Sequence, residues 1–343
     1  MGVKLIDESI LGDIADAIRE RLIFYEDKMH PMDMPSLIDM IGRDMGISSS
    51  FMGGIFIPYT TNTENIPHAF YSNTLSNTSP VVTRLVKNMY SSFANCVNLV
   101  GRPVCGTNVI EMNFSYDNCI KLTGSPVCGP NVIYMSRAYG NCQNLTGSPV
   151  CGTKVMHMSF TYYNCQKLNG SPVCGDNVVD MSGTYYNCIK LTGSPVCGPN
   201  VVNMAQAYYS CYNLTGSPVC GPNVTDMRGT YAFCYNLTNS PIIGSKVNDI
   251  SSAFSFCNNL SCSYIYGNNI ESANFAYANC PCLETIFLDT VHMPNTKILT
   301  NAFSINNGNP SSIYRSMPIE NAVIYINGLY VNGATPTTAN NRS

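Results

Sequence analysis

The chain has 343 residues, of which 45% are hydrophobic and only 11% are charged. Its 18 basic and 21 acidic side chains offer no basic surface to nucleic acid or to an anionic membrane, so neither partner is expected. No apolar run reaches the roughly 18 residues that span a bilayer, and we expect no membrane insertion. The amino terminus lacks a basic region followed by an apolar stretch, so no secretory signal is predicted and the chain is expected to fold in a cytoplasm.

The first 47 residues predict a small helical hairpin. Ile10, Ile14 and Ile18 lie four residues apart, which is the spacing of one face of an amphipathic helix. Leu37 and Ile41 place apolar side chains on one face of a second helix. Two short helices bury too little apolar surface to be stable alone, so the hairpin is expected to need a partner surface.

Two stretches of this segment resemble a known module. "IADAIRE" at residues 14–20 and "PMDMPSLIDMI" at residues 31–41 are similar to a short module that opens many structural proteins of phages infecting Gram-positive bacteria. The usual Lys-Thr-Gly after the first helix is replaced here by "RLIFYE". The resemblance implies that residues 1–47 anchor the chain to other virion proteins, with Ile10, Ile14, Ile18, Leu37 and Ile41 at the contact.

Residues 48–85 are polar and contain Gly53 and Gly54. We interpret them as a linker that becomes the amino-terminal cap of the domain that follows.

From residue 86 to residue 285 the chain repeats itself with a period of 23 residues. Fifteen of the 17 cysteines keep this period. They form two series, Cys96, Cys119, Cys142, Cys165, Cys188, Cys211, Cys234, Cys257 and Cys280, and Cys105, Cys128, Cys151, Cys174, Cys197 and Cys220. A fixed period of this length is the signature of a repeat protein whose units stack on one shared core.

Each repeat predicts a short helix and a very short strand. In one repeat, Val132, Met135, Tyr139, Cys142 and Leu145 follow the spacing of a helix face, which predicts a helix from about Val132 to Cys142. The following "TGSPVCG" combines turn formers and a proline with a brief apolar segment, typical of a bend and a strand. The predicted fold class is therefore an α/β repeat solenoid of about nine repeats.

The recurring cysteines are expected to be small buried apolar side chains. A disulfide between the two series, such as Cys119 with Cys128, is the alternative. No pair of CxxC motifs occurs, and His30, His68, His157 and His292 are scattered, so neither a metal nor a cofactor is expected.

The pattern V-x-x-M-x-x-x-[FY]-x-x-C-x-x-L resembles the BspA-like class of leucine-rich repeats, found in bacterial surface proteins and in some phage proteins. The match covers about residues 86 to 285 in nine registers. The chain departs from ordinary leucine-rich repeats because it has one steady leucine and replaces the L-x-L strand with S-P-V-C. The resemblance implies a solenoid, and the departure argues against a wide, regular horseshoe sheet.

Residues 286–343 are expected to form a β-rich cap and a tail. "VIYINGLYV", from Val323 to Val331, places two β-rich runs around Asn327-Gly328, which predicts a hairpin.

No phosphate loop, nucleophile elbow or zinc-protease motif occurs, so we do not expect an enzyme. Positions between the core residues of the predicted helix vary from repeat to repeat and are candidate ligand-binding residues, with neutral drift of solvated positions as the alternative. They are Tyr134, Arg137, His157, Phe160, Tyr163, Asp180, Tyr186, Asn203, Gln206, Tyr209, Asp226 and Arg228.

Together these patterns predict a phage virion protein, assembled in the host cytoplasm. We expect a tail- or baseplate-associated fibre or receptor-binding subunit that presents the solenoid to a host glycan or protein. The sequence leaves open whether the chain is a monomer or a homo-oligomer of the kind that many fibres form. A head fibre or capsid decoration protein is one alternative. A bacterial BspA-like surface adhesin is the other.

Overall fold

The computed structural model describes residues 64–73, 82, 85–265 and 269–283, together with the backbone of three further strands. These strands are β3 (Thr285–Leu288), β4 (Val323–Ile326) and β5 (Leu329–Asn332). The predicted hairpin at 1–47 and its residues Ile10, Ile14, Ile18, Leu37 and Ile41 lie outside the described residues.

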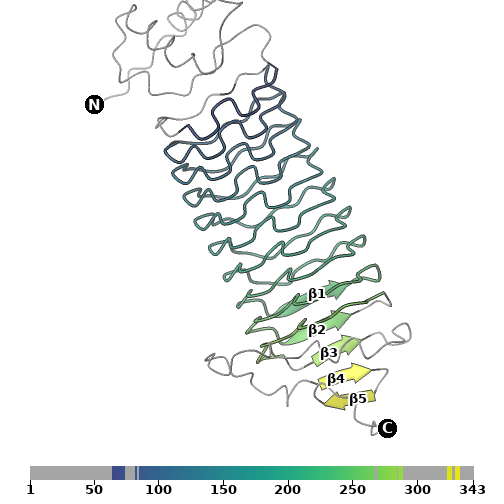
Figure 1. Cartoon of the computed structure of the whole chain (residues 1–343). Helices are drawn as coiled ribbons and strands as arrows, with labels where there is room; N and C mark the ends of the chain where they lie inside the picture. The colour runs from purple at the N-terminus through teal and green to yellow at the C-terminus, as the bar shows by residue number, and fades with distance from the viewer. Residues whose placement is uncertain are drawn as a thin grey trace, which may run out of the picture.

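The described chain winds into coils that stack along one axis (Figure 1). Parallel bridges join each coil to the next in an unbroken ladder from Asn65 to Ser272, every rung linking residues one 23-residue period apart. The ladder includes Asn65, which lies in the segment 48–85 where the sequence predicts linker and cap. The prediction of a repeat solenoid is confirmed.

The helix predicted in each repeat is wrong. The segment from Val132 to Cys142 forms turns, and Arg137 and Asn141 have left-handed φ angles of 53° and 57°, which no right-handed helix accommodates. The apolar spacing of three and four residues arises instead from successive tight turns, in which every second amide donates to the carbonyl three residues before it.

Backbone hydrogen bonds alternate along this segment between its own coil and the next one. The amides of Tyr139 and Asn141 donate to carbonyls of the following coil, at 2.9 and 2.7 Å. The amides of Gly140 and Cys142 donate three residues back within the coil, each at 3.1 Å. Half of the amides therefore bind coils together, and the other half hold each turn.

The core is a set of parallel columns, in which each residue type stacks on its copy in the next coil. Val, Met, aromatic, Cys and Leu columns fill the interior, and their members are almost all fully buried. The aromatic column stacks from Phe93 to Tyr277, with nearly parallel rings whose centroids lie 5.1 to 5.7 Å apart. Because no coil could bury this surface alone, stacking supplies most of the hydrophobic stabilisation.

In five coils before residue 239 the P-V-C segment is not the strand that the sequence predicts, and a core tyrosine hydroxyl binds the backbone of its valine instead. The Val173 amide donates to the Tyr185 hydroxyl at 3.0 Å, and this hydroxyl donates to the Val173 carbonyl at 2.6 Å. Both polar groups of the valine are thus satisfied by the core instead of a neighbouring strand. Four other tyrosines bind the valine of their own coils in the same way: Tyr116, Tyr139, Tyr162 and Tyr208.

The first strand lies in a coil whose aromatic core residue lacks a hydroxyl. Phe254 stands to Ile242 in the chain as Tyr185 stands to Val173. Because Phe254 has no hydroxyl, the backbone of Ile242 has no phenol to bind. Ile242 lies in β1 (Asn239–Ile243), which pairs in parallel with β2 (Cys262–Ile265). β2 pairs with β3 and β3 with β4, both parallel, and β4 with β5 antiparallel, forming the hairpin that the sequence predicts from 323 to 331 (Figure 1).

All 17 cysteines lie in the described part of the chain, and none forms a disulfide. In the first series the thiol donates to a carbonyl of the preceding coil, as Cys142 does to Tyr116 at 3.0 Å. In the second series the thiols are half-buried, and Cys105 also approaches the Met112 sulfur at 3.4 Å. The cysteines are core groups that add a weak intercoil hydrogen bond, and the disulfide alternative is wrong.

The glycine after each second-series cysteine is required by the close approach of coils. A Cβ at Gly198 would lie 2.6 Å from the Gly175 carbonyl oxygen and 3.2 Å from the Cys174 sulfur. A side chain there would push neighbouring coils apart, which accounts for the constant Cys-Gly pair.

Thiol reactivity tests this packing. At about pH 8 the native protein should show one fast-reacting thiol, Cys282, because it is exposed, whereas burial raises the pKa of Cys96 to about 11 and disfavours its thiolate. Dithionitrobenzoate would measure this, and in denaturant without a reductant all 17 thiols should react. If most thiols became reactive only after reduction, the disulfide-free core would be contradicted.

Candidate binding surface

The structure places the twelve predicted site residues in three aligned columns and one adjacent position. None of them is fully buried. Tyr134, His157, Asp180, Asn203 and Asp226 form the bridge column, which is the ladder of parallel bridges described above. Arg137, Phe160 and Gln206 share a second column, Tyr163, Tyr186 and Tyr209 a third, and Arg228 lies beside Asp226.

Most polar members of the bridge column have a local structural role. Asp180 and Asn203 each accept a hydrogen bond from the backbone amide two residues later, at 2.9 and 3.0 Å. Such a contact holds a tight turn at the point where the coils bridge. Tyr134 and His157 instead stack their rings at 5.5 Å. The polar residues in this column thus stabilise the turn, a role that their variability between repeats does not reveal.

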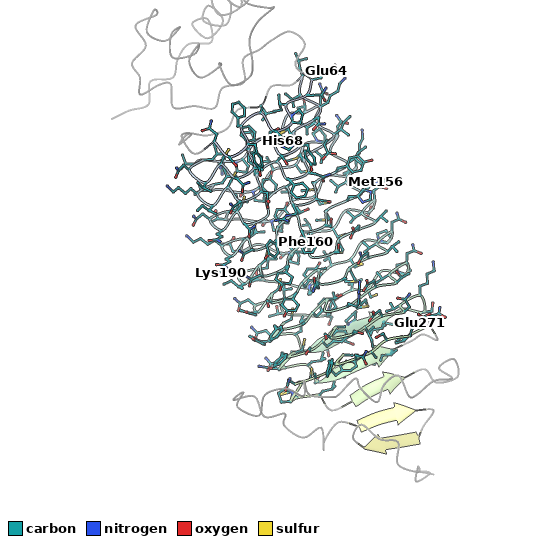
Figure 2. All side chains as sticks on the ribbon, viewed as in Figure 1. Glu64, His68, Met156, Phe160, Lys190 and Glu271 are labelled. Carbon is teal, nitrogen blue, oxygen red and sulfur yellow. The ribbon has the colours of Figure 1, made fainter. Side chains whose placement is uncertain are left out.

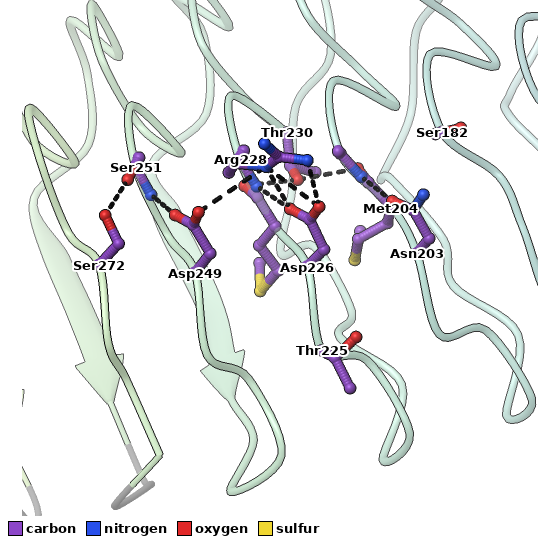
Figure 3. A network of polar contacts seen from close by, with 12 residues as sticks. Ser182, Asn203, Met204, Thr225, Asp226, Arg228, Thr230, Asp249, Ser251 and Ser272 are labelled. Carbon is purple, nitrogen blue, oxygen red and sulfur yellow. Dashed lines mark hydrogen bonds and ion pairs between the residues drawn. The ribbon is translucent and has the colours of Figure 1, made fainter.

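Arg228 takes part in a surface ion network. Its guanidinium bonds to the Asp226 carboxylate at 2.7 Å and lies 3.7 Å from that of Asp249, which in turn accepts the Ser251 amide (Figure 3). The hydrogen bond that Arg228 donates to Asp226 is the main reason that the pKa of Arg228 is raised. Exposed pairs of this kind contribute little to stability, and the two carboxylates are both engaged.

Arg137 is also occupied by its neighbours. Its guanidinium lies 3.3 Å from Asp117 and 5.4 Å above the Phe114 ring. Burial raises the pKa of Asp117, and Arg137 opposes that shift. A Cβ at Gly140 would lie 2.4 Å from an Asp117 oxygen, so the glycine makes room for this carboxylate.

The third column forms an aromatic stack on the surface. The rings of Tyr163 and Tyr186 lie 5.3 Å apart, and those of Tyr186 and Tyr209 lie 4.5 Å apart and almost parallel. All three side chains are half-buried, and partial burial raises the pKa of Tyr186 and Tyr209. Phe160 joins the stack edge-on, at 6.0 Å from Tyr163.

Four further aromatic residues extend this stack, and the sequence analysis missed them. Tyr209 contacts Phe233 at 5.3 Å, and Phe233 in turn stacks on Phe256 at 4.5 Å. Tyr235 lies 6.3 Å from Phe233 and stacks on Tyr212 at 4.9 Å. We call the connected set the aromatic ridge: Phe160, Tyr163, Tyr186, Tyr209, Tyr212, Phe233, Tyr235 and Phe256. Every member is half-buried.

Phe233 and Phe256 depart from the repeat pattern at a conformational cost. Their φ angles are 63° and 60°, in the left-handed region, which costs about 1–2 kcal/mol for an ordinary residue and which asparagine adopts more readily. Five earlier repeats carry asparagine at this position: Asn95, Asn118, Asn141, Asn164 and Asn187. This replacement of asparagine by phenylalanine was the signal in the sequence that could have revealed the ridge.

The asparagines also form a hydrogen-bonded ladder that the phenylalanines cannot continue. The side-chain amide of Asn187 donates to the side-chain oxygen of Asn164 at 2.7 Å, and that of Asn118 donates to the side-chain oxygen of Asn95 at 3.0 Å. Phe233 and Phe256 therefore give up an intercoil hydrogen bond as well as the more favourable backbone residue.

A shallow groove follows another edge of the rod. Its lining includes the apolar residues Met156, Val179 and Val202 and the amides of Asn177 and Asn200. Figure 2 shows Met156 and Lys190 at opposite edges of the described rod, with Phe160 between them. The groove and the ridge therefore lie on different parts of the surface.

Two further searches cover the described residues alone. Among them, no three His, Cys, Asp or Glu side chains are grouped closely enough to hold a metal ion. No helix in this part of the chain has the length and apolar character needed to cross a membrane.

Comparisons with known proteins give a similarity to solved structures alone. No family model matches the chain, and no curated protein matches it. A solved structure, a leucine-rich cell surface protein from Faecalibacterium prausnitzii A2-165, is 13% identical, with a TM-score of 0.30 over 65% of this chain and 76% of that one.

Proposed function

We propose that this chain is a virion structural protein of a phage, a tail- or baseplate-associated rod that presents its side surface to the host cell. The observation that carries the proposal is the unbroken ladder of coils from Asn65 to Ser272. One continuous core of stacked columns joins all of these coils. A stack of this kind aligns equivalent side chains along its length, which suits the display of an extended binding surface.

The assignment to a phage particle rests on the resemblance of residues 1–47 to the opening module of phage structural proteins. In this proposal the module attaches the chain to other virion proteins, and the solenoid projects from that attachment. The host partner is a surface glycan or protein, and homo-oligomers of the rod would multiply its contacts with the cell surface.

Immunogold electron microscopy of particles from the source lysate tests the proposal. Antibody raised against residues 86–285 should place gold at the end of the tail. Gold on the head would favour a capsid fibre or decoration protein, and gold on bacterial surfaces without labelled particles would favour the BspA-like adhesin. Either result would overturn the tail assignment.

A chain that lacks residues 1–47 serves as the matched variant. It should keep the circular dichroism spectrum of the solenoid but be missing from purified particles, because the anchoring module is gone. Particles that still carry the truncated chain would contradict the anchoring role.

A further inference from the structure

The aromatic ridge groups aromatic side chains on the surface where other repeats carry smaller or polar residues. Phe233 and Phe256 replace asparagine in a left-handed backbone conformation. Tyr212 and Tyr235 take the position that Val97 and Gln143 have in earlier repeats. The left-handed conformation itself recurs in every coil, so the ridge is distinguished by its aromatic residues at a position where asparagine is less costly. The ridge is therefore a better candidate for a ligand-binding site than the full set of twelve variable positions.

The polar groups beside the carboxyl-terminal part of the ridge are amides. In the column next to Tyr212 and Tyr235, the coils of Tyr163 and Tyr186 carry Lys167 and Lys190, whereas the three later ridge coils carry exposed Asn213, Asn236 and Asn259. The eight ridge residues themselves include no charged side chain. A ligand on these three later coils would meet rings, phenol hydroxyls and amides, and would gain little from a charge of its own.

The ridge is also periodic along the rod. Its members come from successive coils, and the pairs Tyr212-Asn213 and Tyr235-Asn236 recur one period apart. A ring and an amide at constant spacing form a row of similar subsites. A polymer with a repeating unit can occupy such a row, and each additional subsite raises its apparent affinity.

We propose that the aromatic ridge binds an uncharged polysaccharide of the host surface, with the polymer running along the rod. The C–H faces of the sugar rings would pack on the aromatic side chains, while sugar hydroxyls would bond to the phenols and amides. This inference rests on the proposed function, because it names the partner and the site for the same side surface.

The test uses the full chain and host cells, with the double variant Phe233→Asn and Phe256→Asn. Asparagine is the usual residue of this column and suits its backbone, so the variant should fold with unchanged or higher stability. We expect cell binding to fall at least about tenfold, which corresponds to about 1.4 kcal/mol. The matched control is Phe114→Ser, which removes a half-buried aromatic residue with a left-handed φ angle outside the ridge and should bind like the wild type.

Chemical treatment of the cells identifies the partner. Periodate oxidation of surface glycans should abolish binding, protease treatment should leave it intact, and uncharged polysaccharide released from the host wall should compete. Protease-sensitive binding, or a double variant that binds as well as the wild type, would overturn the ridge assignment but leave the proposed function standing. A wild-type chain that binds no host cells at all would contradict the proposed function itself.

Discussion

Raising the pH from about 8 to about 11 should unfold the solenoid in a steep transition with its midpoint near pH 10. The cause is the column of buried thiols. Burial raises the folded-state pKa of seven fully buried cysteines well above that of an ordinary thiol: Cys119, Cys142, Cys165, Cys188, Cys211, Cys234 and Cys257. In the unfolded chain these thiols ionise near their ordinary pKa of about 8.5.

The direction follows from which state loses protons first. Below the unfolded pKa both states are protonated, and the packed thiols contribute their full stability. As the pH rises toward the folded pKa, only the unfolded chain ionises, so its free energy falls by about 1.4 kcal/mol per thiol and pH unit. Seven thiols together lower the free energy of unfolding by about 10 kcal/mol per pH unit, comparable to the whole stability of a typical domain.

Urea denaturation under anaerobic conditions, at a series of pH values, would measure the slope. The control is the double variant Cys188→Ala and Cys211→Ala, which removes two of the seven titrating groups. It loses stability at all pH values because of the cavities, but its slope should decrease by about 2.7 kcal/mol per pH unit. A slope that is unchanged in this variant, or a wild type still folded at pH 11.5, would contradict the assignment.

The core could be predicted from the sequence because the same residue types recur every 23 residues. The column of Cys142 repeats without interruption and those of Met135 and Tyr139 with few replacements, and residues that recur once per coil stack on their own copies whatever the local backbone does. The strength of the repeat thus specified the columns and their burial.

The local conformation could not be predicted in the same way. A spacing of three and four residues fits a helix, but it also fits a chain whose alternate amides donate to the next coil. These intercoil bonds join residues that are far apart in sequence, so a window of one repeat does not contain them. The asparagine before six of the nine first-series cysteines was the local signal, because asparagine adopts the left-handed conformation that a helix excludes.

The candidate site could likewise be predicted only in part. Variation between repeats correctly selected side chains that are not fully buried, including Tyr163, Tyr186 and Tyr209. It did not separate residues that hold turns, such as Asp180, from those in the ridge. Phe233 and Phe256 were overlooked because six of the nine residues in their column are asparagine, and the column was not among the variable positions considered.

The central aromatic column should be the most sensitive part of the core. Tyr185→Ala should lower the free energy of unfolding by about 3–5 kcal/mol, the range measured for large aromatic truncations in cores. The Tyr185 ring is fully buried between those of Tyr162 and Tyr208, at 5.5 and 5.4 Å. Its removal leaves a cavity that the neighbouring coils cannot close without breaking their hydrogen bonds, because each coil is held at a fixed spacing by the bridge column.

Two phenylalanine variants separate the ring from its hydroxyl. Tyr185→Phe removes the group that binds the Val173 amide and carbonyl and should cost about 1–2 kcal/mol. The buried Tyr231 hydroxyl has no hydrogen-bond partner among the described residues, so Tyr231→Phe should be neutral or stabilising. Urea denaturation followed by circular dichroism would measure all three variants. If Tyr231→Phe cost as much stability as Tyr185→Phe, the role assigned to the hydrogen bonds with Val173 would be wrong. A loss below about 1 kcal/mol for Tyr185→Ala would contradict the importance of the aromatic column for stability.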